Sequence, residues 1–258
     1  MIPKDKLNEI RLLLEVKYKE FNTRDFISTD PIQVPHSLKR KEDIEIASFL
    51  TCTIAWGQRK TIISNAFRLM KLLENHPYEF LMNSSSKEWE SLGRFVHRTF
   101  QTSDLLYFLD ALKRIYNECG GLEKVFNEGY KNGGIYESLI HFRKVFMQWS
   151  PLKRLNKHVS NPAKGSAAKR LNLFLMWMVR KDDVGVHFGL WPAISPGDLI
   201  IPLDVHVGRV SRDLGLLTRK ANDWKAAIEL SSVLRSFDPS DPVKYDFSLF
   251  GMGLEKKI

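Results

Sequence analysis

Two charged residues in the C-terminal half of the chain have the chemistry needed for nucleophilic catalysis. Lys169 lies between the turn-forming residues 160–165 and the apolar stretch 170–179, and Asp204 directly follows the apolar residues 199–203. The positive end of a helix dipole disfavours an ammonium group near a helix N-terminus by about 0.3–1 kcal/mol. A neutral lysine amine in that place can form a Schiff base. An ionised carboxylate can accept a proton from such a nucleophile or stabilise a developing positive charge.

Both residues also have simpler interpretations. Lys169 fits a surface lysine whose ammonium extends into water. Asp204 fits a helix N-cap that accepts hydrogen bonds from the amides of His206 or Val207, an arrangement worth about 1 kcal/mol. The capping and catalytic roles of Asp204 are compatible, because the same amides and the helix dipole stabilise its anionic form.

The turn before Lys169 suggests a second type of chemistry, the binding of phosphate. Pro162 and Gly165 predict a tight turn, and Ser166 is expected to cap the next helix, with Lys169 as its third residue. The backbone N–H groups of Gly165, Ser166 and Ala167 would then bind an anion, since the first amides of a helix lack intrahelical partners. Any two helices can be joined by such a turn, so an ordinary connection is the alternative.

The charge of the chain also points to an anionic partner. The formal net charge is +9 and the sequence pI is about 9.4. Residues 151–220 hold 12 Lys and Arg against 5 Asp and no Glu. Such an excess predicts nucleic acid first and an anionic membrane second, with a solvated basic face as the alternative. The basic side chains expected to contact double-stranded DNA are Lys157, Lys164, Arg170, Arg209 and Arg212.

Two motifs resemble those of the helix-hairpin-helix DNA glycosylases of base-excision repair. "GSAAKRLNLFL" is similar to their hairpin, G-x-G-x-K-x-x-N, and "PLDVHVGRVSRDLG" is similar to their V-D-x-H-x-x-R-x-x-x-R-x-G segment. Gly165 falls on the first hairpin glycine, Lys169 on the nucleophilic lysine of the bifunctional members and Asn172 on the asparagine. The positions that fall on the second motif are the catalytic aspartate Asp204, His206, Arg209 and Gly215.

The chain departs from this pattern in three places. Ala167 replaces the second hairpin glycine, and Lys169 and Asp204 are 35 residues apart, a wider gap than is usual in the family. The cysteine cluster of some members is absent, since the chain has only Cys52 and Cys119. The wider sequence, from about Pro31, resembles an uncharacterised bacterial family that is usually placed near these glycosylases and has no established activity.

The resemblance implies a DNA repair glycosylase, with or without abasic-site lyase activity, acting on double-stranded DNA. The target nucleotide would be flipped out of the helix, because its reacting carbon is inaccessible in the base stack. The side chains considered for a base pocket are Gln58, Trp177, Phe188 and Trp191. Core packing is the alternative for the aromatic residues, and especially for Trp177. Neither a metal ion nor a cofactor is expected, and two cysteines are too few for a cysteine-ligated iron–sulfur cluster.

Helical periodicity dominates the chain and predicts an all-α fold of roughly ten helices. Two helical lobes are expected, residues 1–35 with 190–258 and residues 36–189, the second ending in the hairpin. Residues 170–179 are apolar on nearly every face, which predicts a buried helix. Only residues 199–203 resemble a strand, and Pro202 argues against one. Residues 23–41 and 181–202 are expected to be long irregular loops.

Other features narrow the choice of protein class. No signal peptide or apolar stretch of membrane-spanning length is evident, so a cytoplasmic protein, monomeric by default, is expected. A non-catalytic, structure-specific DNA-binding protein is the main alternative to a glycosylase. A helical scaffold whose basic face meets a protein or an acidic membrane is the third.

Overall fold

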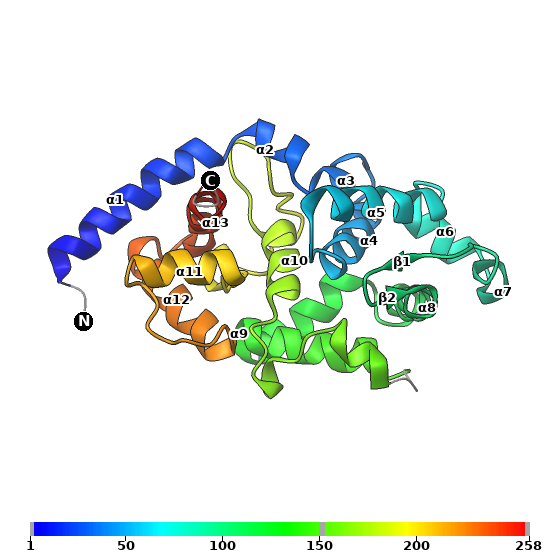
Figure 1. Ribbon diagram of the computed structural model, residues 1–258. Coiled ribbons are helices and arrows are strands. Elements are labelled where there is room, and N and C mark those ends of the chain that lie inside the picture. Colours follow the sequence, from blue (N-terminus) through cyan, green and yellow to red (C-terminus); the bar gives the residue numbers. More distant parts are fainter. Residues whose placement is uncertain (1–2, 150–152, 256–258) are drawn as a thin grey trace. The chain divides into compact units, whose positions relative to one another are not determined.

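The computed structural model describes residues 3–149 and 153–255, and it confirms the all-α class (Figure 1). The described chain contains thirteen α-helices and one small β-hairpin. The helices are α1 (Lys4–Phe21), α2 (Arg24–Thr29), α3 (Gln33–His36), α4 (Lys41–Thr53), α5 (Arg59–Leu72), α6 (Pro77–Asn83), α7 (Ser86–Trp89), α8 (Thr102–Glu118), α9 (Leu122–Met147), α10 (Lys169–Val179), α11 (Val205–Asp213), α12 (Trp224–Phe237) and α13 (Tyr245–Glu255). The shorter elements are β1 (Val96–His97), β2 (Phe100–Gln101) and the 3₁₀ helices η1 (Lys153–Lys157), η2 (Pro162–Lys164), η3 (Pro196–Asp198) and η4 (Pro242–Lys244).

Two compact units make up the chain. Unit 1 contains the described parts of residues 1–26 and 162–258, and unit 2 contains those of 27–161. The sequence predicted lobe boundaries after residues 35 and 189, whereas the two units divide after residues 26 and 161. Helix α10 therefore belongs to unit 1, with the two ends of the chain, and not to the central segment as predicted. That each unit folds as a domain stays a prediction.

Unit 2 is built around aromatic side chains of α4, α8 and α9. Phe49 stacks on Phe108 with ring centroids 5.7 Å apart and meets Phe142 and Phe146 edge-on. Eleven of the thirteen α4 residues are buried, which makes this helix the centre of the unit. The hairpin of β1 and β2 was not predicted, because strands of two residues are too short to produce an alternating pattern.

In unit 1, α10 is the buried helix that the apolar stretch predicted, with eight of its eleven residues buried. Helix α13 packs against both α1 and α11. Gly251 allows the close approach of α1, since a Cβ there would lie 2.4 Å from the Phe21 ring. Gly253 similarly brings α13 against His206 at the start of α11. These contacts fix the helix that begins after Asp204.

One correction concerns the long loops. Residues 23–41 contain the short helices α2 and α3, while residues 181–202 are irregular apart from η3. Residues 199–203 form no strand, in agreement with the argument from Pro202. Within the described chain, no helix is both long and apolar enough to span a bilayer.

Candidate functional site

Asp204 is the N-cap of α11, as predicted. Its Oδ1 accepts hydrogen bonds from the amides of His206 at 2.8 Å and Val207 at 2.9 Å. Asp204 is half-buried, and no hydrogen bond joins its Oδ2 to another described residue. One carboxylate oxygen therefore anchors the helix, and the second is available to a ligand.

The turn before Lys169 differs from the prediction. Helix α10 begins at Lys169, and its N-cap is Ala168 in the left-handed conformation, with φ 49° and ψ 35°. Ser166 therefore does not cap the helix, and Lys169 is its first residue rather than its third. The Ser166 hydroxyl instead accepts a hydrogen bond from the Ala168 amide at 3.2 Å. A left-handed alanine is strained, and the described chain has three other non-glycine residues with a positive φ, Glu74, Asn75 and Arg98.

Lys169 is half-buried at the start of α10. No hydrogen bond or ion pair joins its side chain to any residue that the structure describes. Asn172, one turn further along, is buried and donates from Nδ2 to the Ala167 carbonyl at 3.0 Å. The match of Asn172 to the hairpin motif thus has a structural explanation, because this bond closes the turn that precedes Lys169.

A short segment, residues 222–224, binds both the Lys169 turn and Asp204. The Trp224 amide donates to the Gly165 carbonyl at 2.9 Å, and Ser166 forms an isolated antiparallel bridge with Asp223. Asn222 donates from Nδ2 to the Asp204 carbonyl at 3.1 Å. The two candidate catalytic residues are therefore held through one shared segment within unit 1, despite the 35 residues between them.

Gly208 allows this segment to lie close to α11. A Cβ at Gly208 would be 2.7 Å from Asn222 Oδ1 and 2.9 Å from an Arg212 nitrogen. Gly215 has a separate role, since its φ of 77° lets the chain turn after the C-cap Leu214. Both glycines of the second motif thus have backbone reasons for their position.

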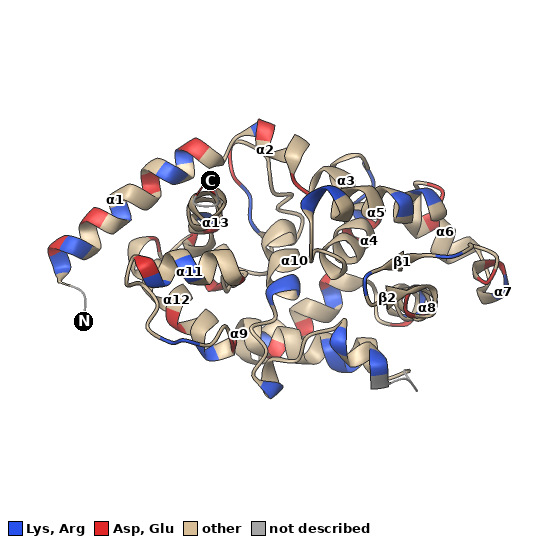
Figure 2. Ribbon diagram, in the orientation of Figure 1, with Lys and Arg blue, Asp and Glu red and all other residues tan. Residues whose placement is uncertain are grey.

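The predicted phosphate contacts fall into two groups. Arg209 donates to the Gly253 carbonyl at 2.8 Å, and Arg212 donates to the Arg219 carbonyl and to Asn222, so both guanidinium groups already bind within unit 1. The Gly165 amide donates to Pro162 and is also engaged. The remaining predicted contacts are the exposed Lys164, the half-buried Arg170, Ser166, the buried Ala167 and Lys157, which is exposed but belongs to unit 2, and of these Arg170, Ser166 and Lys157 also interact within the protein. One end of α10 accordingly shows Lys and Arg in Figure 2.

Three of the four predicted base-pocket residues lie in unit 1, and Gln58 lies in unit 2. Trp177 and Trp191 are 2% and 0% exposed, and Trp191 meets Phe174 edge-on, so both tryptophans pack in the core. Their burial supports the alternative of core packing. Phe188 is half-buried, and its amide donates to Trp177. Gln58 is an exposed residue at the N-cap of α5, in unit 2.

The hairpin motif itself is not present as a pair of α-helices. The basic segment 151–159, which the sequence suggests as the first helix of the motif, forms the 3₁₀ helix η1, with residues 151 and 152 outside the described residues, and η2 follows it. Gly165 has a φ of 84°, which explains the need for glycine at that turn.

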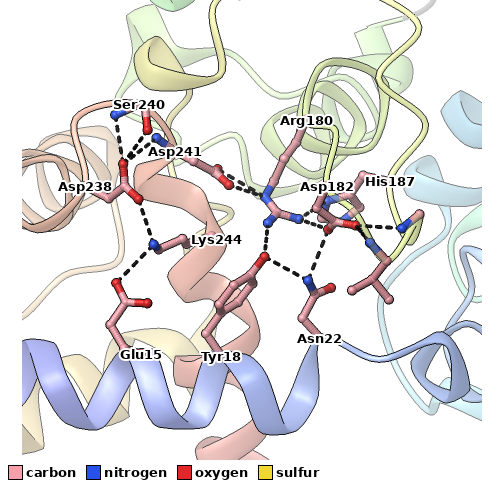
Figure 3. Close-up of polar contacts among 12 residues, drawn as sticks. Glu15, Tyr18, Asn22, Arg180, Asp182, His187, Asp238, Ser240, Asp241 and Lys244 are labelled. Carbon is pink, nitrogen blue, oxygen red and sulfur yellow. Dashed lines mark hydrogen bonds and ion pairs between the residues drawn. The ribbon is translucent and has the colours of Figure 1, made fainter.

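Sequence reasoning missed a buried ionic network at the other end of α10 (Figure 3). Arg180, the C-cap residue, is 1% exposed. Its guanidinium donates to Asp241 at 2.8 and 3.1 Å, to Asp182 at 2.5 Å and to Tyr18 Oη at 2.7 Å, and its Nη1 lies 3.0 Å from His187 Nδ1. The only signal in the sequence was an arginine directly after an apolar helix, because its partners come from residues 18 to 241.

A second ion-pair group extends this network along α1. Lys244 donates to Asp238 at 2.7 Å and lies 3.0 Å from Glu15, which also accepts a hydrogen bond from Tyr245. Burial would raise the pKa of Asp238, but Lys244, Ser240 and the Asp241 amide together hold it far below its ordinary value. These pairs fasten α1 to the segment before α13.

The two carboxylates that flank Arg180 respond differently. Burial raises the pKa of Asp241, although the Arg180 charge opposes the increase. Burial would also raise the pKa of Asp182, but the Arg180 charge and the Gly185 amide outweigh it, so that pKa is lowered. The Arg180 charge therefore outweighs the effect of burial on the pKa of Asp182 but not on that of Asp241.

Residues 30–255 match a protein family described as a protein of unknown function (DUF2400). The chain belongs to this family. No curated protein and no solved structure matches the chain. The DUF2400 match covers Lys169, Asp204 and the 222–224 segment, and its description assigns no activity and no link to the helix-hairpin-helix glycosylases. Within the described part of the chain, no group of three or more His, Cys, Asp or Glu residues could hold a metal ion.

Proposed function

We propose that this protein is a DNA repair glycosylase that uses Lys169 as nucleophile and Asp204 as the carboxylate partner. The observation that carries the proposal is the shared anchoring of both residues to residues 222–224. An unpaired lysine side chain and an unbonded carboxylate oxygen are thus available in one part of unit 1. The resemblance of the two motifs to the helix-hairpin-helix glycosylases supplies the substrate class.

The proposed reaction begins with the free amine of Lys169. This amine attacks C1′ of a flipped-out nucleotide as the N-glycosidic bond breaks, and the base leaves with the bonding electrons as an anion that takes a proton from water. Asp204 accepts the proton released by the attacking nitrogen and stabilises the positive charge on the sugar. Opening of the sugar ring then gives an imine, from which loss of a C2′ proton would expel the 3′ phosphate. Lys164 and Arg170 are the nearest basic residues in sequence for holding the DNA backbone.

Borohydride trapping tests the nucleophile, because reduction of the imine leaves a stable covalent adduct. The wild type is incubated with duplexes that contain an abasic site or one of a panel of oxidised and alkylated bases. We expect Lys169→Ala to abolish the adduct and Asp204→Asn to slow its formation by about 10²–10⁴-fold, the usual contribution of a proton-transfer residue. Lys181→Ala, which removes an exposed lysine of unit 1 that is not among the predicted DNA contacts, is the matched control and should still form the adduct.

Two outcomes would contradict the proposal. If the wild type gives no more adduct than Lys169→Ala on every duplex, the lyase reaction is wrong. Base release that depends on Asp204 but leaves no adduct would then indicate a glycosylase without a lysine nucleophile. Salt-sensitive DNA binding with no base release, unchanged by Lys169→Gln together with Asp204→Asn, would instead indicate a non-catalytic DNA-binding protein.

A further inference from the structure

Unit 2 contains a cavity that the proposed glycosylase reaction does not use. Its volume is about 350 Å³, within the range of small-molecule sites. Residues of α4, α6, α8 and the first turns of α9 line it, and they include carboxylates, lysines and two tyrosine rings. The cavity lies entirely within residues 27–161, so it belongs to one compact unit.

A buried carboxylate, Glu45, is the most unusual part of the lining. Its side chain is 3% exposed, and it accepts a hydrogen bond from Tyr116 Oη at 2.7 Å. Burial and the Glu45 charge raise the pKa of Tyr116, so its hydroxyl remains a donor. The nearest lysine ammonium, that of Lys41, is 3.9 Å from Glu45 and forms its closer ion pair with Glu123. Glu45 thus carries a buried charge whose cation is shared with a second carboxylate.

The remaining lining offers acceptors and aromatic faces. Asn127 Oδ1 is buried and accepts no hydrogen bond from the described residues. Tyr78 meets Tyr116 edge-on at 5.2 Å, and the Arg40 guanidinium lies 4.2 Å from the Tyr78 ring centroid. That contact shows that a guanidinium group can stack on this ring. An occupant should therefore donate several hydrogen bonds and carry positive charge.

We propose that this cavity binds a small organic cation with a guanidinium group. The planar group would donate to Glu45 and Asn127 and lie against the tyrosine rings, since a guanidinium presents five donors in a fixed fork. The buried carboxylate of Glu45 and the unbonded acceptor Asn127 Oδ1 favour a cationic donor over an anion. A simple anion such as a free phosphate would be repelled by the buried carboxylate of Glu45.

Isothermal titration of the full chain with agmatine at low salt tests this site. Agmatine carries a guanidinium and an ammonium group, and glutarate serves as the anionic comparison. We expect saturable agmatine binding, weakened at least about tenfold by Glu45→Gln, which keeps an acceptor for Tyr116 but removes the charge. Glu90→Gln, which changes an exposed carboxylate outside the cavity, should leave binding unchanged.

A second variant, expected to bind agmatine more tightly, keeps the site testable if Glu45→Gln fails to fold. Lys124→Met removes a positive charge from the exposed part of the lining, so agmatine should bind about two- to fivefold more tightly. Stronger binding of glutarate than of agmatine would overturn the proposal. So would an absence of agmatine binding to the wild type, or equal binding by wild type and a folded Glu45→Gln. DNA trapping by Lys169 would be unaffected by any of these results.

Discussion

Helix α10 carries a cationic residue at each end, and the two ends differ in nearly every respect. Lys169, its first residue, is half-buried, and its side chain has no polar partner among the described residues. Arg180, directly after its last residue, is almost completely buried and bonded to two aspartates, a tyrosine and a histidine. The helix dipole favours the cation at the C-terminus and disfavours the one at the N-terminus.

This difference separates a structural cation from the one that we propose to react. Four of the five N–H donors of Arg180 contact protein groups. These contacts hold α1, α10 and the segment before α13 together. Lys169 contributes nothing comparable to the fold, and the strained Ala168 precedes it. A cation that lies at the unfavourable end of a helix dipole and has no polar partner is a better candidate for a catalytic role than one enclosed by counter-ions.

The largest expected effect is at Arg180. Replacing it in Arg180→Met should lower the free energy of unfolding by about 3–5 kcal/mol, because Asp182 and Asp241 would remain buried without their counter-ion. Urea denaturation followed by circular dichroism measures the loss. Arg235→Met, which removes a half-buried arginine bonded only to carbonyls, is the control and should cost less. Equal losses for the two variants would mean that the ionic network adds nothing special.

Acidification should weaken the Arg180 end through Asp182. The folded pKa of Asp182 lies below the unfolded value of about 3.9, so its contribution is present above that pH and is lost as the pH falls through the folded pKa. The free energy of unfolding should therefore fall below about pH 4, and Asp182→Asn should make this fall shallower. Asp241→Asn should not, because the pKa of Asp241 is raised and its contribution has the opposite sign. Unfolding measured from pH 3 to pH 6 decides between them.

The smallest expected change in stability is at Lys169. Lys169→Met should leave the free energy of unfolding unchanged or raise it by about 0.3–1 kcal/mol, since it removes a cation from the positive end of α10. The same variant should lose all covalent trapping on DNA. A loss of more than about 1 kcal/mol in urea would show that Lys169 supports the fold, and the contrast between the two ends of α10 would fail.

Local features were predictable where their cause is local. The buried α10 followed from its run of apolar residues, and the Asp204 cap followed from an acidic residue before a helical stripe. The prediction of Ser166 as a cap failed because Ser166 instead pairs with Asp223, 57 residues later. The tryptophans considered for a base pocket proved to be core residues, which side-chain type alone does not distinguish. The Glu45 cavity gave no signal, since its lining comes from four separate helices.

The sequence by itself determined the helical class, the position of α10 and the cap on α11, because periodicity, apolar runs and capping residues act within a few residues along the chain. Only the tertiary structure decided which charges are enclosed and which remain accessible. Arg180 and Lys169 are both basic residues at the ends of one apolar helix, and nothing within ten residues of either reveals that Tyr18 and Asp241 reach the first. Burial and pairing depend on contacts between distant segments, and these arise only when the chain has folded.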